Sequence, residues 1–116
     1  MPTSSVIISF SVENVARANI LLTSSRAFYR FATSDTGEEG SVPYNNLDDT
    51  ISTILDMLTN LDGDLMPSDV KCEVIINANN SKTTYNNSNI SQSCYNSLIT
   101  LLSQISDEFT FIRGFK

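Results

Sequence analysis

The chain has 116 residues, of which 41% are hydrophobic, so it has the length of one domain and enough apolar side chains for a core of its own. Its formal net charge of −6 argues against tight, unspecific binding to nucleic acid or to an anionic membrane surface. No segment approaches the roughly twenty consecutive apolar residues of a membrane span, and no signal peptide is visible. We therefore expect a single globular domain over residues 1–116, cytoplasmic and not bound to a membrane.

The first third of the chain predicts three strands. Apolar residues at every second position of 6–12 alternate mainly with serines, which is the period-two pattern of a half-buried strand. Further apolar runs cover residues 16–23 and 26–33, with Ser24 and Ser25 between them. Consecutive strands with such tight connections predict an antiparallel meander.

The register of this meander depends on its turns, because a slip of one residue moves every side chain to the opposite face. A two-residue turn at Ser24 and Ser25 would put Ile20, Leu22, Ala27, Tyr29 and Phe31 on the core face. A three-residue link at 13–15 would add the apolar residues of the first strand to that face. The outer face of the hairpin would then carry Arg17, Arg26, Phe28 and Arg30, together with Leu21.

The middle of the chain predicts a loop followed by a helix. Glycine, proline and acidic residues mark residues 34–44 as the loop. Apolar residues then recur at helical spacing over 47–61, with Asn45 or Asn46 in position to cap the first turn.

The last third predicts a strand, a second helix and a closing strand. Residues 70–76 alternate between apolar and polar side chains, and the polar stretch after them holds only a weak signal for a hairpin arm at 82–85. Ser91 is placed to cap a helix whose apolar stripe runs over 94–105. The aromatic and β-branched residues of 109–113 predict the final strand.

This order predicts an α+β fold, in which an antiparallel three-strand meander is followed by helix, strand, helix and strand, and both helices pack on one mixed sheet. The order is similar to that of the ribonuclease H-like fold. Enzymes of that fold hold metal ions with acidic residues, one of them in the middle of the first strand. This chain has Ile7, Ile8, Ser9 and Phe10 there. The resemblance therefore implies a topology without the acidic site.

The sequence contains little that could carry catalysis. Histidine is absent, which removes the commonest general base and the commonest transition-metal ligand. Cys72 and Cys94 fall on predicted core faces, where reduced thiols act as small hydrophobes. The adjacent carboxylates at 38–39 and 48–49 point in different directions and are expected to be solvated. We expect no catalytic residue, no metal and no cofactor.

Acidic residues are concentrated between Phe31 and Val70, where no Lys or Arg occurs. They are Asp35, Glu38, Glu39, Asp48, Asp49, Asp56, Asp62, Asp64 and Asp69. The loop, the first helix and its exit should therefore form one negative surface, able to attract a basic partner. The candidate binding residues of this surface are Glu38, Glu39, Asp48, Asp49 and Asp56. The alternative is a solvated face that only keeps the protein soluble.

The outer face of the first hairpin is the second candidate surface. Its residues Arg17, Arg26, Phe28 and Arg30 combine arginines with an aromatic ring, which can pair with phosphates and stack on bases. The same residue types are enriched at protein interfaces. A third possibility is that a helix covers this face.

These observations favour a small, non-catalytic interaction protein, such as an inhibitor, an adaptor or an accessory subunit. We expect a protein partner, bound through the acidic surface or the hairpin face, and self-association into a homo-oligomer. The composition is typical of phage or other viral accessory proteins. The alternative is a nucleic-acid-binding module that uses the Arg and Phe residues of the hairpin face, followed by an enzyme of the metal-carboxylate type.

Overall fold

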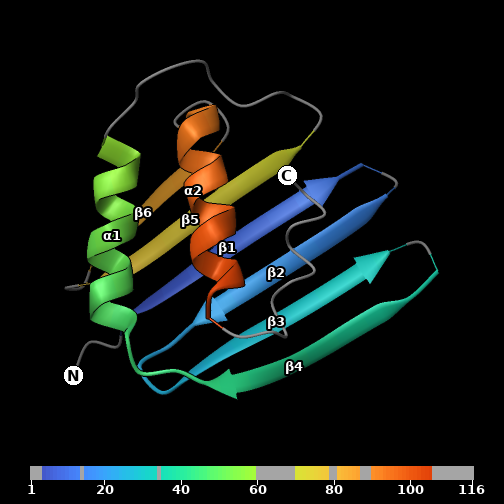
Figure 1. Ribbon diagram of the computed structural model, residues 1–116, viewed down its shortest axis with the longest axis horizontal. Helices are drawn as coiled ribbons and strands as arrows, with labels where there is room; N and C mark the ends of the chain where they lie inside the picture. Colours follow the sequence, from blue (N-terminus) through green and yellow to red (C-terminus); the bar gives the residue numbers. More distant parts are fainter. Residues whose placement is uncertain are drawn as a thin grey trace.

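The computed structural model describes residues 4–13, 15–33, 35–59, 70–78, 81–86 and 90–105. The strands in this part are β1 (Ser5–Val12), β2 (Ala16–Leu22), β3 (Arg26–Thr33), β4 (Gly37–Pro43), β5 (Lys71–Ala78) and β6 (Ser81–Asn86). The helices are α1 (Leu47–Thr59) and α2 (Gln92–Ser103). The six strands form one antiparallel sheet in the order β4-β3-β2-β1-β5-β6, and both helices lie on one of its faces (Figure 1). The predicted α+β class is confirmed.

The register predicted for the first three strands is also confirmed. Ser24 and Ser25 form the two-residue turn between β2 and β3, and the pairing of Val12 with Ala16 leaves three residues between β1 and β2. Thr23 closes the turn through its backbone amide, which donates to the Arg26 carbonyl (2.9 Å). Its hydroxyl oxygen also accepts a hydrogen bond from the Arg26 amide (3.0 Å). A threonine before a tight turn thus satisfies backbone groups that the turn leaves unpaired.

The loop expected at 34–44 is wrong, because most of it forms β4, which pairs with β3 and makes the meander four-stranded. The connecting turn repeats the chemistry of the preceding one. The hydroxyl oxygen of Thr33 accepts from the amides of Asp35 (3.3 Å) and Thr36 (3.1 Å), as that of Thr23 does in its own turn.

Gly40 explains why β4 does not resemble a strand in sequence. It stands opposite Tyr29 on the core side of the sheet, and a Cβ at this position would come within 2.7 Å of the Tyr29 hydroxyl oxygen. The end of the tyrosine ring occupies the space that a larger residue would need, so a larger residue here would require the ring to move. The residue that weakens the strand signal is therefore the one that lets the ring pack.

The predicted mixed sheet is wrong, since β5 pairs with β1 in the antiparallel direction. A strand that follows a helical crossover runs parallel to the strand before that helix. If β3 were the last strand before α1, β5 would run parallel to β1. The additional strand β4 reverses the chain once more, so β5 enters antiparallel to β1. The strand directions expected from the ribonuclease H-like order are wrong for the same reason.

The weakly signalled hairpin arm exists as β6, which pairs antiparallel with β5 at one edge of the sheet. The strand predicted at 109–113 and the end of the first helix predicted near residue 61 lie outside the described residues.

The second helix, α2, packs against β1 in the middle of the sheet. The Ser91 hydroxyl caps α2 by accepting from the Cys94 amide (3.1 Å), as predicted. Ile90 and Tyr95 are both buried, at the two positions of a hydrophobic staple. The Tyr95 ring packs edge-on against Phe10 of β1, with 5.6 Å between ring centroids. The core therefore lies between α2 and the middle of the sheet.

The first helix begins after Asn46, whose carbonyl accepts a hydrogen bond from the Thr50 amide (2.9 Å), in agreement with the predicted cap region. The buried Tyr44 hydroxyl is hydrogen-bonded to the Thr50 hydroxyl, and burial raises the pKa of Tyr44. The face that α1 turns to the core is formed by Leu47, Ile51, Ile54 and Leu58.

Both cysteines are buried and form no disulfide, as predicted: Cys72 lies on β5 and Cys94 on α2. Burial raises the pKa of both thiols, and it raises that of Cys72 to about 12. The electrostatic effects of Cys94 and of the Glu73 carboxylate add to the shift at Cys72. Thiols held in the neutral form behave as core side chains rather than as nucleophiles.

Candidate functional site

The two helices cover one face of the sheet (Figure 1), and the opposite, outer face carries the hairpin residues singled out in the sequence. Successive side chains of a strand point to opposite faces, so Arg17, Arg26, Phe28 and Arg30 all project here while their neighbours fill the core. Phe28 is 41% exposed, which is unusual for a large aromatic side chain, and neither described helix covers it (Figure 1). We call this surface the outer face.

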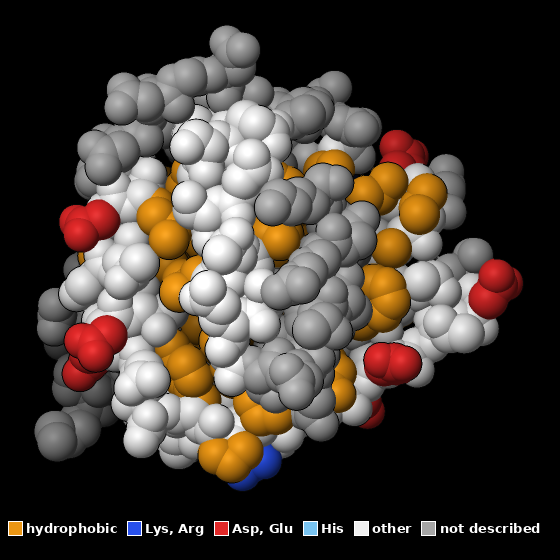
Figure 2. Space-filling model, in the orientation of Figure 1, with side chains coloured by type: hydrophobic (Ala, Val, Ile, Leu, Met, Phe, Trp, Pro, Cys, Tyr) orange, Lys and Arg blue, Asp and Glu red, His pale blue; other side chains and the backbone are white. Residues whose placement is uncertain are grey.

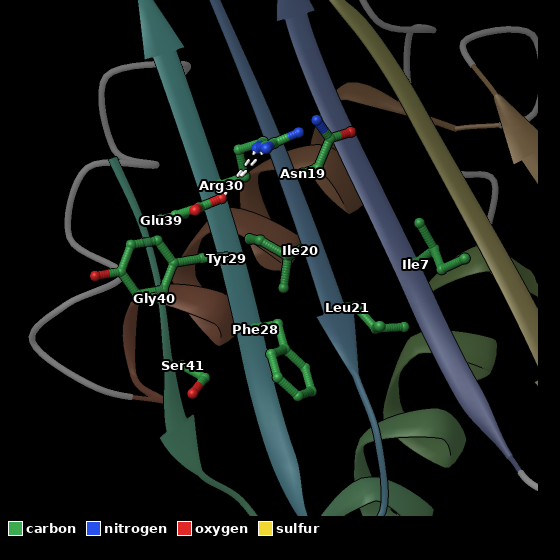
Figure 3. Close-up of a pocket in the computed structure, with 10 residues that line it drawn as sticks. All are labelled: Ile7, Asn19, Ile20, Leu21, Phe28, Tyr29, Arg30, Glu39, Gly40 and Ser41. Atoms are coloured by element: carbon green, nitrogen blue, oxygen red, sulfur yellow. Dashed lines mark hydrogen bonds and ion pairs between the residues drawn. The ribbon is translucent and has the colours of Figure 1, made fainter. Parts of the chain in front are cut away.

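An apolar row crosses the middle of the outer face. The strand register aligns four apolar side chains on neighbouring strands: Phe28 (β3), Leu21 (β2), Ile7 (β1) and Ile75 (β5). Directly opposed residues on paired strands have their Cβ atoms about 5 Å apart, so the four form one continuous row. Figure 3 shows three of them side by side on β3, β2 and β1. The row runs across the strands and not along any one of them.

The charges of the described residues are segregated between the two faces. All five described Lys and Arg residues project from the outer face: Arg17, Arg26, Arg30, Lys71 and Lys82. Only two of the described carboxylates share it, Glu39 and Glu73, so the described residues give this face a formal charge of five minus two, or +3. The six other described carboxylates, and no described Lys or Arg, lie elsewhere. A chain with a net charge of −6 thus presents a positive face.

These charges flank the apolar row unequally. On one side of the apolar row, the next row of outward side chains carries Arg26 on β3 and Lys82 on β6, near its two ends. This row contains no carboxylate. The row on the other side contains Arg30 but also Glu39 and Glu73. We call the first of these rows the basic flank. Arg17 and Lys71 lie one row further from the apolar row, on the side of Arg30.

Most of the cations on this face have no counter-charge. Arg30 pairs with Glu39 through an N–O distance of 3.3 Å, and Arg26 donates through Nε and Nη2 to the hydroxyl oxygen of Ser41 (3.1 and 3.0 Å). Within the part of the chain that the structure describes, the side chains of Arg17, Lys71 and Lys82 are in no ion pair or hydrogen bond. Four of the five cations are therefore available to an anionic partner.

An open hollow of about 600 Å³ lies where the apolar row meets Arg30 (Figure 3). Its lining includes Ile7, Leu21 and Phe28 on one side and the Arg30–Glu39 pair on the other. A second hollow of about 470 Å³ shares this ion pair and extends to Arg17. The outer face is thus hollowed beside the apolar row rather than flat.

The residues predicted to form one acidic surface are not brought together. Asp48, Asp49 and Asp56 lie on α1, whereas Glu39 lies on the outer face, paired with Arg30, and Glu38 is its neighbour on the opposite side of β4. Figure 2, which views the helix side, shows acidic side chains over α1 and a separate group at the opposite edge of the molecule. The expected loop is a strand, and its alternation separates adjacent carboxylates.

Sequence reasoning missed four residues of the outer face: Ile7, Ile75, Lys71 and Lys82. The two isoleucines do leave a signal, because each is the middle residue of three consecutive apolar residues in a strand that otherwise alternates. Such a residue is apolar on the face that alternation assigns to solvent. Their alignment with Leu21 and Phe28 requires the pairing of β1 with β5, which the sequence does not specify.

Other kinds of site find no support in the described part of the chain. No group of three or more Cys, Asp or Glu side chains there is arranged to hold a metal ion. Neither described helix has the length and the apolar composition needed to cross a membrane. No family model, curated protein or solved structure matched the chain.

Proposed function

We propose that this chain is a protein-binding module without catalytic activity, and that its outer face binds an acidic protein partner. The observation that carries the proposal is the placement of every described Lys and Arg around one apolar row that no described helix covers. An apolar centre with a polar rim is the usual anatomy of a protein interface, and Phe and Arg are enriched there. Inhibitors, adaptors and accessory subunits bind through surfaces of this kind.

Binding of nucleic acid is the second candidate, because unpaired arginines next to the exposed ring of Phe28 are also suited to phosphates and bases. Two observations favour protein. Phe28 is the single aromatic residue among the described positions of the outer face, and the aliphatic residues beside it offer no stacking surface. The net charge of −6 also repels a nucleic acid, which is charged along its whole backbone, more strongly than a protein that carries carboxylates on one surface.

Self-association is a further proposal that the two faces support. The described residues outside the outer face carry six carboxylates and no Lys or Arg, so they are complementary in sign to the outer face of another copy. The carboxylates of α1 (Asp48, Asp49 and Asp56) are equally suited to a basic partner. A homo-oligomer assembled in this way would join unlike surfaces and would depend on salt concentration.

The test is a binding measurement with a partner captured by affinity purification from the native host after nuclease treatment. Titration of that partner with the joint variant Phe28→Ala, Arg30→Ala should show a loss of at least about 2 kcal/mol, the threshold of a binding hot spot. The matched control, Asp49→Ala with Asp56→Ala, makes two truncations on the helix side and should leave the affinity within about threefold. Circular dichroism and urea titration check that both variants fold.

Each other outcome decides against the proposal. Equal binding by the hairpin variant and the wild type would show that the outer face is not the binding surface. Loss in the α1 variant alone would assign the partner to the acidic helix. Capture that disappears with nuclease, and an affinity that falls steeply with added salt, would favour nucleic acid instead.

A further inference from the structure

We propose that the partner element seated on the outer face is an acidic amphipathic helix that lies across the strands, with its carboxylates toward the basic flank. This inference rests on the proposed function and specifies the shape and charge pattern of the partner. It follows from the direction of the apolar row, its length and the unequal charges on its two sides.

The direction of the row favours a helix over an extended segment. Phe28, Leu21, Ile7 and Ile75 follow one another across the strands, so an element that covers all four must cross β3, β2, β1 and β5. An extended segment in this position cannot pair with strand backbones that already pair with each other. Its own N–H and C=O groups would be pressed against apolar side chains without partners. A helix satisfies these groups internally.

The length of the row fits a short helix. Neighbouring strands are about 4.8 Å apart, so the three steps from β3 to β5 span about 14 Å. A helix rises 1.5 Å per residue, and about ten residues, or three turns, cover this span. Apolar residues at three- and four-residue spacing on such a helix would form one stripe against the row.

The charges specify how the helix is placed. Adjacent outward rows are about 7 Å apart along the strands, and a helix about 10 Å in diameter therefore brings its flanking side chains over the basic flank. Arg26 and Lys82 stand at the two ends of that flank without a carboxylate between them. On the other side, Glu39 and Glu73 would repel acidic side chains. Carboxylates on one side of the stripe satisfy both conditions.

The described helices of this chain do not provide such an element to a second copy. The apolar side of α1 is buried against its own sheet through Ile54 and Leu58, and that of α2 through Leu98 and Leu102. Exposing either side would dismantle the core. Neither described helix can therefore be the occupant, and we assign this role to a helix of another protein.

The experiment selects peptides of about 16 residues from a displayed random library on the full chain, which leaves room for three helical turns. Enriched peptides are synthesised and titrated against the wild type and two matched variants. One variant is Arg26→Glu with Lys82→Glu, in the basic flank. The other is Arg17→Glu with Lys71→Glu, which makes the same charge change on the same face but about 14 Å from the apolar row.

We expect enriched peptides to carry apolar residues at three- and four-residue spacing with Asp or Glu on one side of that stripe. The basic-flank variant should lose at least about tenfold in affinity. The distant variant should lose clearly less, because it lowers the charge of the face without adjoining the seated helix. Circular dichroism of the peptides should show helix formation on binding.

Three outcomes would overturn this inference while leaving the proposed function in place. They are acidic peptides with two-residue apolar spacing, equal losses in the two variants, and a library that yields no peptide sensitive to Phe28→Ala. Enrichment of basic peptides on the outer face would instead contradict an acidic partner and so the proposed function itself. The native-partner titration tests that function independently of any peptide.

Discussion

The same strands form both faces of the six-stranded sheet, but the two faces differ in residue composition and in burial. On the core face, the inward residues of β1 and β2 are uniformly apolar, and six of them are fully buried: Val6, Ile8, Phe10, Ala18, Ile20 and Leu22. On the outer face, serines, asparagine and arginines alternate with a single row of four apolar residues. Hydrophobic burial explains the central positions of the core face but leaves the apolar row of the outer face without a partner in the described chain.

This difference separates residues that fold the protein from residues that are free to bind. Both described helices pack on the core face only. Substitutions on the core face and on the outer face should therefore change different properties of the protein. Changes on the core face should lower the free energy of unfolding. Changes on the outer face should alter binding while the fold persists. If substitutions on both faces lower the free energy of unfolding equally, the two faces do not have these separate roles.

The largest effect is expected for Leu98→Ala, because Leu98 of α2 is completely buried. Loss of its side chain should lower the free energy of unfolding by about 2–5 kcal/mol, which includes the cost of the cavity left behind. Leu21→Ala removes the same atoms from the half-buried apolar row and should cost about 1 kcal/mol or less. Urea denaturation of both variants measures the difference. Equal losses would show that the apolar row belongs to a core.

The core face also contains an ionisable group, the Cys72 thiol, which burial keeps in its neutral form. Burial raises the pKa of Cys72 from 9.0 to about 12, so above pH 9 the unfolded chain binds fewer protons than the folded one. Stability should therefore fall between pH 9 and 12 by up to about 1.4 kcal/mol per pH unit from this thiol. Cys72→Ala should show a shallower fall in urea titrations from pH 8 to 10. Parallel curves would mean that Cys72 does not contribute.

The core face could be predicted from the sequence because its signals are local. Alternation places the inward residues of β1 and β5, a two-residue turn at Ser24 and Ser25 sets the register of β2 and β3, and Ser91 marks the beginning of α2. Each signal lies within a few residues of the structure that it determines. The predicted outer positions of Arg17, Arg26, Phe28 and Arg30 followed from the same register.

The sheet edges could not be predicted in this way. β4 contains two glycines and a proline, and the packing of Tyr29 over Gly40 is a contact between two strands that neither stretch shows by itself. A usable signal was nevertheless present, because Thr33 precedes its turn as Thr23 precedes the turn between β2 and β3. Missing β4 also gave the wrong direction for β5 and hid the alignment of Ile75 with Ile7.

The smallest change in stability is expected for Glu39→Gln. This variant is also the most specific test of the outer face. The Arg30–Glu39 pair has both side chains 71% exposed, and exposed pairs contribute about 0.2–1 kcal/mol, so the free energy of unfolding should change by less than about 1 kcal/mol. The affinity for an acidic partner should instead increase. The Glu39 carboxylate occupies Arg30 and lowers the positive charge of the face, so its removal should strengthen binding of an acidic partner by about twofold to tenfold.

Glu38→Gln is the matched control for this variant, because it removes the same charge from the neighbouring residue on the opposite side of β4. Titrations of both variants at two salt concentrations should show a gain for Glu39→Gln that shrinks as salt screens the charges, and a smaller effect for Glu38→Gln. Equal gains would mean that only the net charge of the protein matters. A loss of affinity on removal of Glu39 would mean that this carboxylate contacts the partner directly, and that the partner is basic at this point of the outer face.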